Sequence, residues 1–274
     1  MRIAVLSAAL VLAASAVFTP RLLADDLDDA LNSLKQAEPS KDPAKIKELA
    51  AAAHATAKKY EGPAPADADK ESYEARARYA KDVDHYSEYA LYALATQLRS
   101  DPKTAMDLVS TLQQQNPKSE YLEMPEAILI EVDNALSRNQ SDRAVALAQR
   151  LIAVANKKAP EGTSPADWDR VKNAALGTGY FIIGFNACQH NKFAESDRNL
   201  RAALPLLKGD NGRLGPALLC LGVVDANLAQ MTNSKAKMIE ASKFSQQGAA
   251  IPGPTQDQAY KNSLAQRAAA DRMQ

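Results

Sequence analysis

Residues 180–203 read YFIIGFNACQHNKFAESDRNLRAA. Apolar residues recur three or four positions apart on both sides of a polar break at 189–192. This spacing places the apolar side chains along one face of each of two successive helices. The break contains Asn191 and is too short to hold another element, so the stretch predicts a helix pair joined by a tight turn.

The same helical period continues through most of the chain on both sides of this pair. The breaks between periodic segments contain proline, glycine and asparagine, which end helices for specific backbone reasons. No convincing run alternates apolar and β-branched residues as a strand would. We therefore predict an all-α fold in which antiparallel helix pairs stack as a solenoid. The expected helices are 27–34, 46–60, 70–98, one starting near 102, 124–136, 142–155, 168–189, 193–207, 214–229, 235–248 and 256–272.

The order of residue types within the pair resembles the tetratricopeptide (TPR) repeat. That family has an aromatic, a large apolar and a small residue on helix A, then small and aromatic residues on helix B. The positions that match here are Tyr180, Ile183 and Gly184, followed by Phe193, Ser196, Leu200 and Ala203. A second unit has Leu218, Leu221, Gly222, Ala241 and Pro252 at the matching positions. An earlier unit has Tyr89, Tyr92, Ala93, Ala105, Val109, Leu112 and Pro117. A degenerate unit runs over 128–155 around Ala144.

The resemblance covers about residues 88–254, but the repeats are irregular. Ser196 stands where the family usually has alanine, and the closing proline of that unit is missing. A non-repeating helical bundle with similar spacing is the alternative reading. The expected organisation is a signal peptide over 1–24, an N-terminal helical cap and linker over 25–68, TPR-like repeats over 69–254 and a C-terminal capping helix over 255–274.

In such a fold the A helices line a concave surface, so the resemblance implies a ligand groove. The implied groove residues are Phe181, Phe185, Gln189, Leu219, Val223 and Asn227, with Leu94 and Gln97 as earlier equivalents. This largely apolar surface with amide groups suits an amphipathic helix or an extended peptide. The alternative is that helix 256–272 covers these side chains as ordinary core.

Composition and the N-terminus indicate where the protein acts. Arg2 and the apolar run 3–18 are typical of a secretory signal, with cleavage near Ala24 or after Ala14-Ser15-Ala16. We expect an exported, periplasmic or secreted protein, with an uncleaved anchor as the alternative. No later segment is apolar enough to span a bilayer, so no stable membrane span is expected after signal cleavage. The formal net charge of zero makes nucleic acid an unexpected partner.

No catalytic or cofactor-binding pattern emerges from the sequence. The three histidines lack zinc-ligand spacing, and no nucleophile elbow is found. Cys188 and Cys220 fall on predicted helices in neighbouring repeats, where they could bridge or pack as small apolar thiols. The sequence therefore predicts a non-catalytic scaffold without cofactor or metal that binds a protein or peptide segment. A structural or self-assembling envelope component, and an enzyme with an unrecognised site, are the alternatives.

Overall fold

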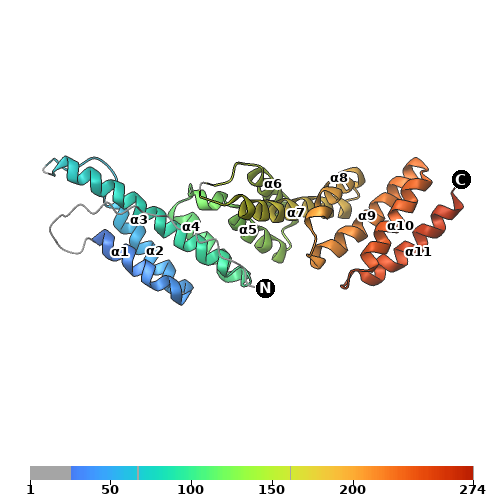
Figure 1. The fold of residues 1–274 in the computed structure, drawn as a ribbon, viewed down its shortest axis with the longest axis horizontal. Coiled ribbons are helices and arrows are strands. Elements are labelled where there is room, and N and C mark those ends of the chain that lie inside the picture. Colours follow the sequence, from blue (N-terminus) through green and yellow to red (C-terminus); the bar gives the residue numbers. More distant parts are fainter. Residues whose placement is uncertain (1–25, 67, 161, 274) are drawn as a thin grey trace. The chain divides into compact units, whose positions relative to one another are not determined.

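The computed structural model describes residues 26–66, 68–160 and 162–273; the predicted signal peptide, 1–24, lies outside them. This part of the chain is helical and contains no strand, which confirms the all-α prediction (Figure 1). Eleven α-helices are described: α1 (Asp26–Ala37), α2 (Pro43–Lys58), α3 (Lys70–Gln97), α4 (Pro102–Gln115), α5 (Pro125–Ser137), α6 (Ser141–Ala155), α7 (Pro165–Gln189), α8 (Phe193–Ala203), α9 (Asn211–Thr232), α10 (Lys235–Ala249) and α11 (Gln256–Arg272). Three short 3-10 helices are η1 (Glu38–Ser40), η2 (Glu120–Glu123) and η3 (Leu204–Leu206).

Many of these helices begin where the sequence supplies a capping side chain. The carboxylate or hydroxyl accepts a hydrogen bond from a backbone N–H of the first turn, which a helix start would otherwise leave unpaired. The residues that cap in this way are Asp42, Asp69, Asp101, Ser164, Asp210 and Ser234. Proline follows the cap in α2, α4 and α7, where its missing N–H costs nothing.

Proline also explains one difference from the expected boundaries. A single helix was expected over 193–207, but α8 ends at Ala203 and continues only as η3. Pro205 lacks an N–H and cannot donate to the carbonyl of Arg201, so the α-helical ladder stops just before it.

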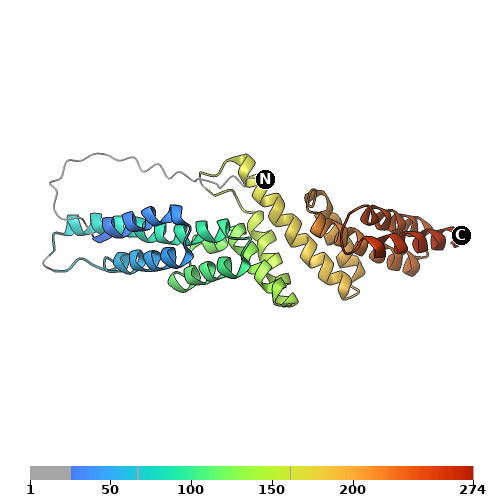
Figure 2. The ribbon, with the colours of Figure 1, turned by 90° about the horizontal axis from the view of Figure 1, so that it is seen from below.

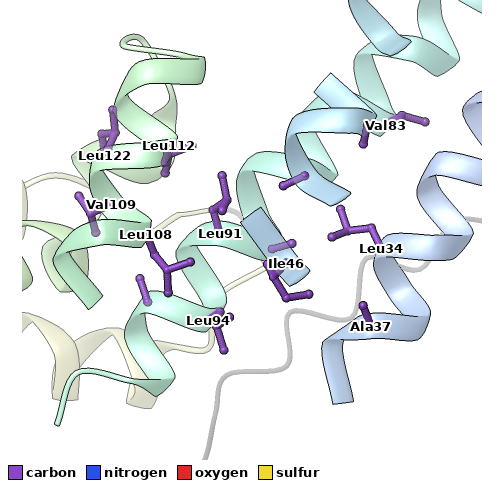
Figure 3. Close-up of a cluster of buried hydrophobic side chains, with 14 of the residues drawn as sticks. Leu34, Ala37, Ile46, Val83, Leu91, Leu94, Leu108, Val109, Leu112 and Leu122 are labelled. Atoms are coloured by element: carbon purple, nitrogen blue, oxygen red, sulfur yellow. The ribbon is translucent and has the colours of Figure 1, made fainter. Parts of the chain in front are cut away.

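The chain divides into two compact units at residue 134, within α5. In the first unit each of α1, α2 and α3 packs on the next helix, and α1 also contacts α3 while α2 contacts α4. Their shared core includes Leu34, Ile46, Leu91 and Leu108 (Figure 3). The expected N-terminal cap helices thus share one core with α3 and α4.

In the second unit α6 to α11 also pack in chain order. In addition α7 contacts α9, and α9 contacts α11. α9, α10 and α11 lie side by side in both ribbon views, in orange to red (Figures 1 and 2).

The two glycines that the repeat pattern singled out, Gly184 and Gly222, lie where helices of this unit cross closely. A Cβ on Gly184 would lie 2.7 Å from Leu200 Cγ and 2.9 Å from the Leu200 backbone nitrogen. The Ser196 hydroxyl donates to the carbonyl of Gly184 over 2.8 Å. A Cβ on Gly222 would collide with Ser245 Oγ on α10. The expectation that small residues permit close helix contact is confirmed at both positions.

The expectation that no later segment is apolar enough to span a bilayer is wrong for α9. Within the described residues, α9 is long and apolar enough to cross a bilayer, with a mean hydropathy of 1.4 over its most apolar window. A helix enclosed by other helices is apolar around most of its circumference and meets the same criterion. α9 contacts α7, α8, α10 and α11 and carries the fully buried Asp225.

Candidate functional site on helices α7 and α9

The predicted groove residues of the second unit lie along α7 and α9. We call the set Phe181, Phe185, Gln189, Leu219, Val223 and Asn227 the α7–α9 face. Phe181 and Phe185 are one helical turn apart, and their rings stack with centroids separated by 5.4 Å. Both rings are half-buried and pack against an apolar cluster that α8 and α9 supply, including Leu200 and Leu221. The aromatic pair is therefore held in place while part of its surface stays accessible.

The remaining members of this face differ in what they can offer a ligand. Leu219 and Val223 are half-buried and one turn apart on α9. Asn227 donates its amide to the carbonyl of Val223 over 2.8 Å, so one of its hydrogens is already used within the helix. Gln189, at the end of α7, is exposed. Its amide is thus the polar group of the set with the freest access to a ligand.

The two earlier groove candidates lie in the first unit. Leu94 is only 5% exposed and belongs to the core that α1 to α4 share (Figure 3), which leaves its side chain little surface for a ligand. Gln97, at the end of α3, is exposed. The structure thus gathers six of the eight candidates on two contacting helices.

The terminal helix covers part of α9. α11 packs mainly on α9 and α10, and Gln266 donates to the carbonyl of Gly222 over 2.7 Å. Ala226 packs in a small apolar cluster with Ala269 and Met273. The side of α9 around Gly222 and Ala226 is therefore core, whereas Phe181 and Phe185 pack against α8 and α9.

A charged network joins three helices of the second unit and was not anticipated. Arg201 on α8 forms ion pairs with Asp197 at 2.6 Å, Asp225 at 2.7 Å and Glu240 at 2.8 Å. Lys237 also pairs with Asp225, whose side chain is fully buried. Burial raises the pKa of Asp225, and the two cations oppose that shift. The network joins α8, α9 and α10 through one buried carboxylate.

The first unit holds a half-buried group of tyrosines that the sequence reading also missed as a group. We call Tyr86, Tyr89, Tyr92 and Tyr121 the tyrosine cluster; neighbouring ring centroids lie 5.2–5.9 Å apart. Tyr86 donates to Glu38 over 2.7 Å. Burial is the main reason that the pKa of each of the four phenols is raised. The spacing of three residues from Tyr86 to Tyr92 was a visible signal, but Tyr121 joins them only through the fold.

The titratable groups often used in catalysis have local structural partners. His54 contacts Asp84 at 2.6 Å, His85 contacts Glu120 at 2.6 Å, and His190 Nδ1 lies 2.9 Å from the carbonyl of Asn186. Among the described residues, no group of three or more His, Cys, Asp or Glu side chains is placed to hold a metal ion.

Comparison with known proteins finds no matching family, no matching curated protein and no matching solved structure. The site is therefore interpreted from its own geometry.

Proposed function

We propose that this chain is an exported, non-catalytic scaffold of the TPR-like type whose α7–α9 face binds a protein or peptide segment. The observation that carries the proposal is the contact between two helices that both keep apolar side chains partly accessible. These are the stacked Phe181–Phe185 pair on α7, and Leu219 and Val223 on α9. Partly exposed aromatic anchors on a rigid support are typical of sites that bind apolar side chains of a partner.

The solenoid arrangement belongs to the same proposal. Contacts between each helix and the next two in chain order, as in α7, α8 and α9, are what stacked helix pairs require. The glycine crossings at Gly184 and Gly222 support an A-helix role for α7 and α9. On this proposal the exposed amide of Gln189 hydrogen-bonds to the backbone of the bound segment.

Site-specific photo-crosslinking in the producing cell tests the proposal. A photoreactive amino acid replaces Gln189, and in a matched control it replaces Arg198, which is also exposed but lies on α8. The proposal predicts one dominant partner adduct from position 189 and little from 198. Equal adducts from both positions, or none from 189, would contradict it.

The export part of the proposal has a separate test. Cell fractionation with mass measurement of the recovered chain should find it outside the cytoplasm and without its first 24 residues, or with the earlier cleavage after Ala16. A full-length chain in the membrane fraction would favour the anchor alternative, and a full-length chain in the cytoplasm would contradict export.

Self-association is the second candidate function, and one observation favours it. Tyr260 and Leu264 are 58% and 56% exposed and lie one turn apart on α11. Residues four apart share a helix face. A second copy that covers this pair would remove two large apolar side chains from water.

Light scattering distinguishes this candidate from a monomeric scaffold. A concentration-dependent closed oligomer that Leu264→Lys abolishes would support self-association. Met231→Lys is the control, because Met231 is 73% exposed but lies at the end of α9. A monomer at all concentrations, or an oligomer that both variants leave intact, would rule out this surface.

A further inference from the structure

The two cysteines of the chain come together between α7 and α9. Cys188 lies in the last turn of α7 and Cys220 in the middle of α9, and both thiols are free. Both side chains belong to the apolar cluster around Leu200 and Leu221. Each thiol is close enough to the other to be the largest influence on its pKa. The cysteines are far apart in sequence, so only the contact between α7 and α9 makes them neighbours.

The surroundings of the two thiols differ in a way that assigns them separate roles. Cys188 is half-buried, whereas Cys220 is buried. The neighbouring thiol of Cys220 lowers the pKa of Cys188, and the neighbouring Cys188 together with burial raises the pKa of Cys220. Cys188 is thus both the more accessible thiol and the one that more readily becomes a thiolate, which is the reactive form.

We propose that Cys188 and Cys220 are a disulfide-forming pair, with Cys188 as the attacking thiol and Cys220 as the resolving thiol. The oxidant is a low-molecular-weight disulfide. The Cys188 thiolate attacks one of its sulfurs, which forms a mixed disulfide and releases one thiolate. Cys220 then gives up its proton to solvent and attacks Cys188 Sγ, which releases the second thiol and leaves the Cys188–Cys220 bond. Two protein thiols are oxidised and one small disulfide is reduced to two thiols.

The bond would join α7 to α9 one turn away from Phe185. Cross-linking helices that already contact in the folded chain restricts the unfolded chain more than the folded one, so the bridge stabilises the second unit. The inference stands on the shared apolar cluster of the two cysteines and on the contact between α7 and α9, and it does not depend on what the α7–α9 face binds.

Equilibration with glutathione redox buffers tests the pair. The chain without the predicted signal peptide, residues 25–274, is incubated at graded ratios of oxidised to reduced glutathione. The samples are then quenched with acid, and their mass is measured by mass spectrometry. The bridge appears as a monomer that has lost the mass of two hydrogens. The fold holds the two thiols together, so the bridge should be harder to reduce in the native chain than in the chain in urea. We expect reduction of the native bridge to need a ratio of reduced to oxidised glutathione about tenfold higher.

Single substitutions test the assigned roles. Cys220→Ser should trap a mixed disulfide at Cys188, seen as one added glutathionyl group, whereas Cys188→Ser should leave the buried Cys220 unmodified in the native chain. Covalent dimers in place of the bridged monomer, or a bridge that forms no more readily in the native chain than in urea, would overturn the pair. Modification of Cys220 in preference to Cys188 would overturn the order of attack.

Discussion

Replacing Gly184 by alanine is the sharpest perturbation of the helix packing. The new Cβ would lie 2.7 Å from Leu200 Cγ and 2.9 Å from the Leu200 backbone nitrogen. The side chain of Leu200 could rotate away, but the backbone nitrogen can only move if α8 shifts from α7. The hydrogen bond from Ser196 to the Gly184 carbonyl would then weaken as well.

The magnitude follows from three terms. Overpacking of this kind costs about 1–3 kcal/mol. Loss of the Ser196 hydrogen bond adds about 1 kcal/mol, and the better helix propensity of alanine returns about 1 kcal/mol. We therefore expect Gly184→Ala to lower the free energy of unfolding by about 1–3 kcal/mol.

Urea denaturation followed by tryptophan fluorescence measures this loss locally. Trp168 is the only tryptophan of the chain and lies on α7, the helix that carries Gly184. The matched control is Gly212→Ala in the first turn of α9, where a Cβ meets only Asp210 Oδ1 at 3.4 Å. The control should be neutral or stabilising by up to about 1 kcal/mol. If Gly184→Ala were as stable as this control, close crossing of α7 and α8 at Gly184 would be refuted.

Two further predictions concern the charged network and the tyrosine cluster. Arg201→Met leaves the buried Asp225 with only Lys237, so it should destabilise the second unit by about 2–4 kcal/mol in the same fluorescence assay. The control Arg198→Met replaces an exposed arginine on the same helix and should change stability by less than about 0.5 kcal/mol. Equal effects of the two substitutions would show that the network contributes nothing specific. The pKa values of the tyrosine cluster are raised in the folded state, so above the unfolded tyrosine pKa of about 10 the folded state keeps protons that the unfolded state loses. Stability should therefore fall as pH rises above about 10. Phenolate absorbance should appear together with loss of helical circular dichroism, and ionisation of all tyrosines well before unfolding would contradict this.

The sequence predicted the helical fold well because its signals are local. The apolar period and the breaks at proline, glycine and asparagine fix where helices form, and Gly184 stands out because a small residue interrupts an apolar face. The boundary at Ala203 could have been read from Pro205. The extra first turn of α7, from Pro165, follows from the Ser164 cap.

The candidate site was less accessible to sequence reasoning, because it depends on which helices touch. Leu94 matched the repeat pattern at the A-helix position, but its burial in the core that α1 to α4 share cannot be read from a period of 3.6. Asp225 was not singled out by any sequence pattern. Its role appears only when α8 and α10 bring Arg201 and Lys237 to it.

The most direct test of the proposed function is the affinity of the segment captured from position 189 for variants of the α7–α9 face. Fluorescence anisotropy with that labelled segment should show that Phe185→Ala raises the dissociation constant about tenfold or more, since a truncated aromatic anchor typically costs over 1 kcal/mol. Circular dichroism checks that the variant stays folded. An unchanged dissociation constant in a folded Phe185→Ala protein would contradict a binding role for this face.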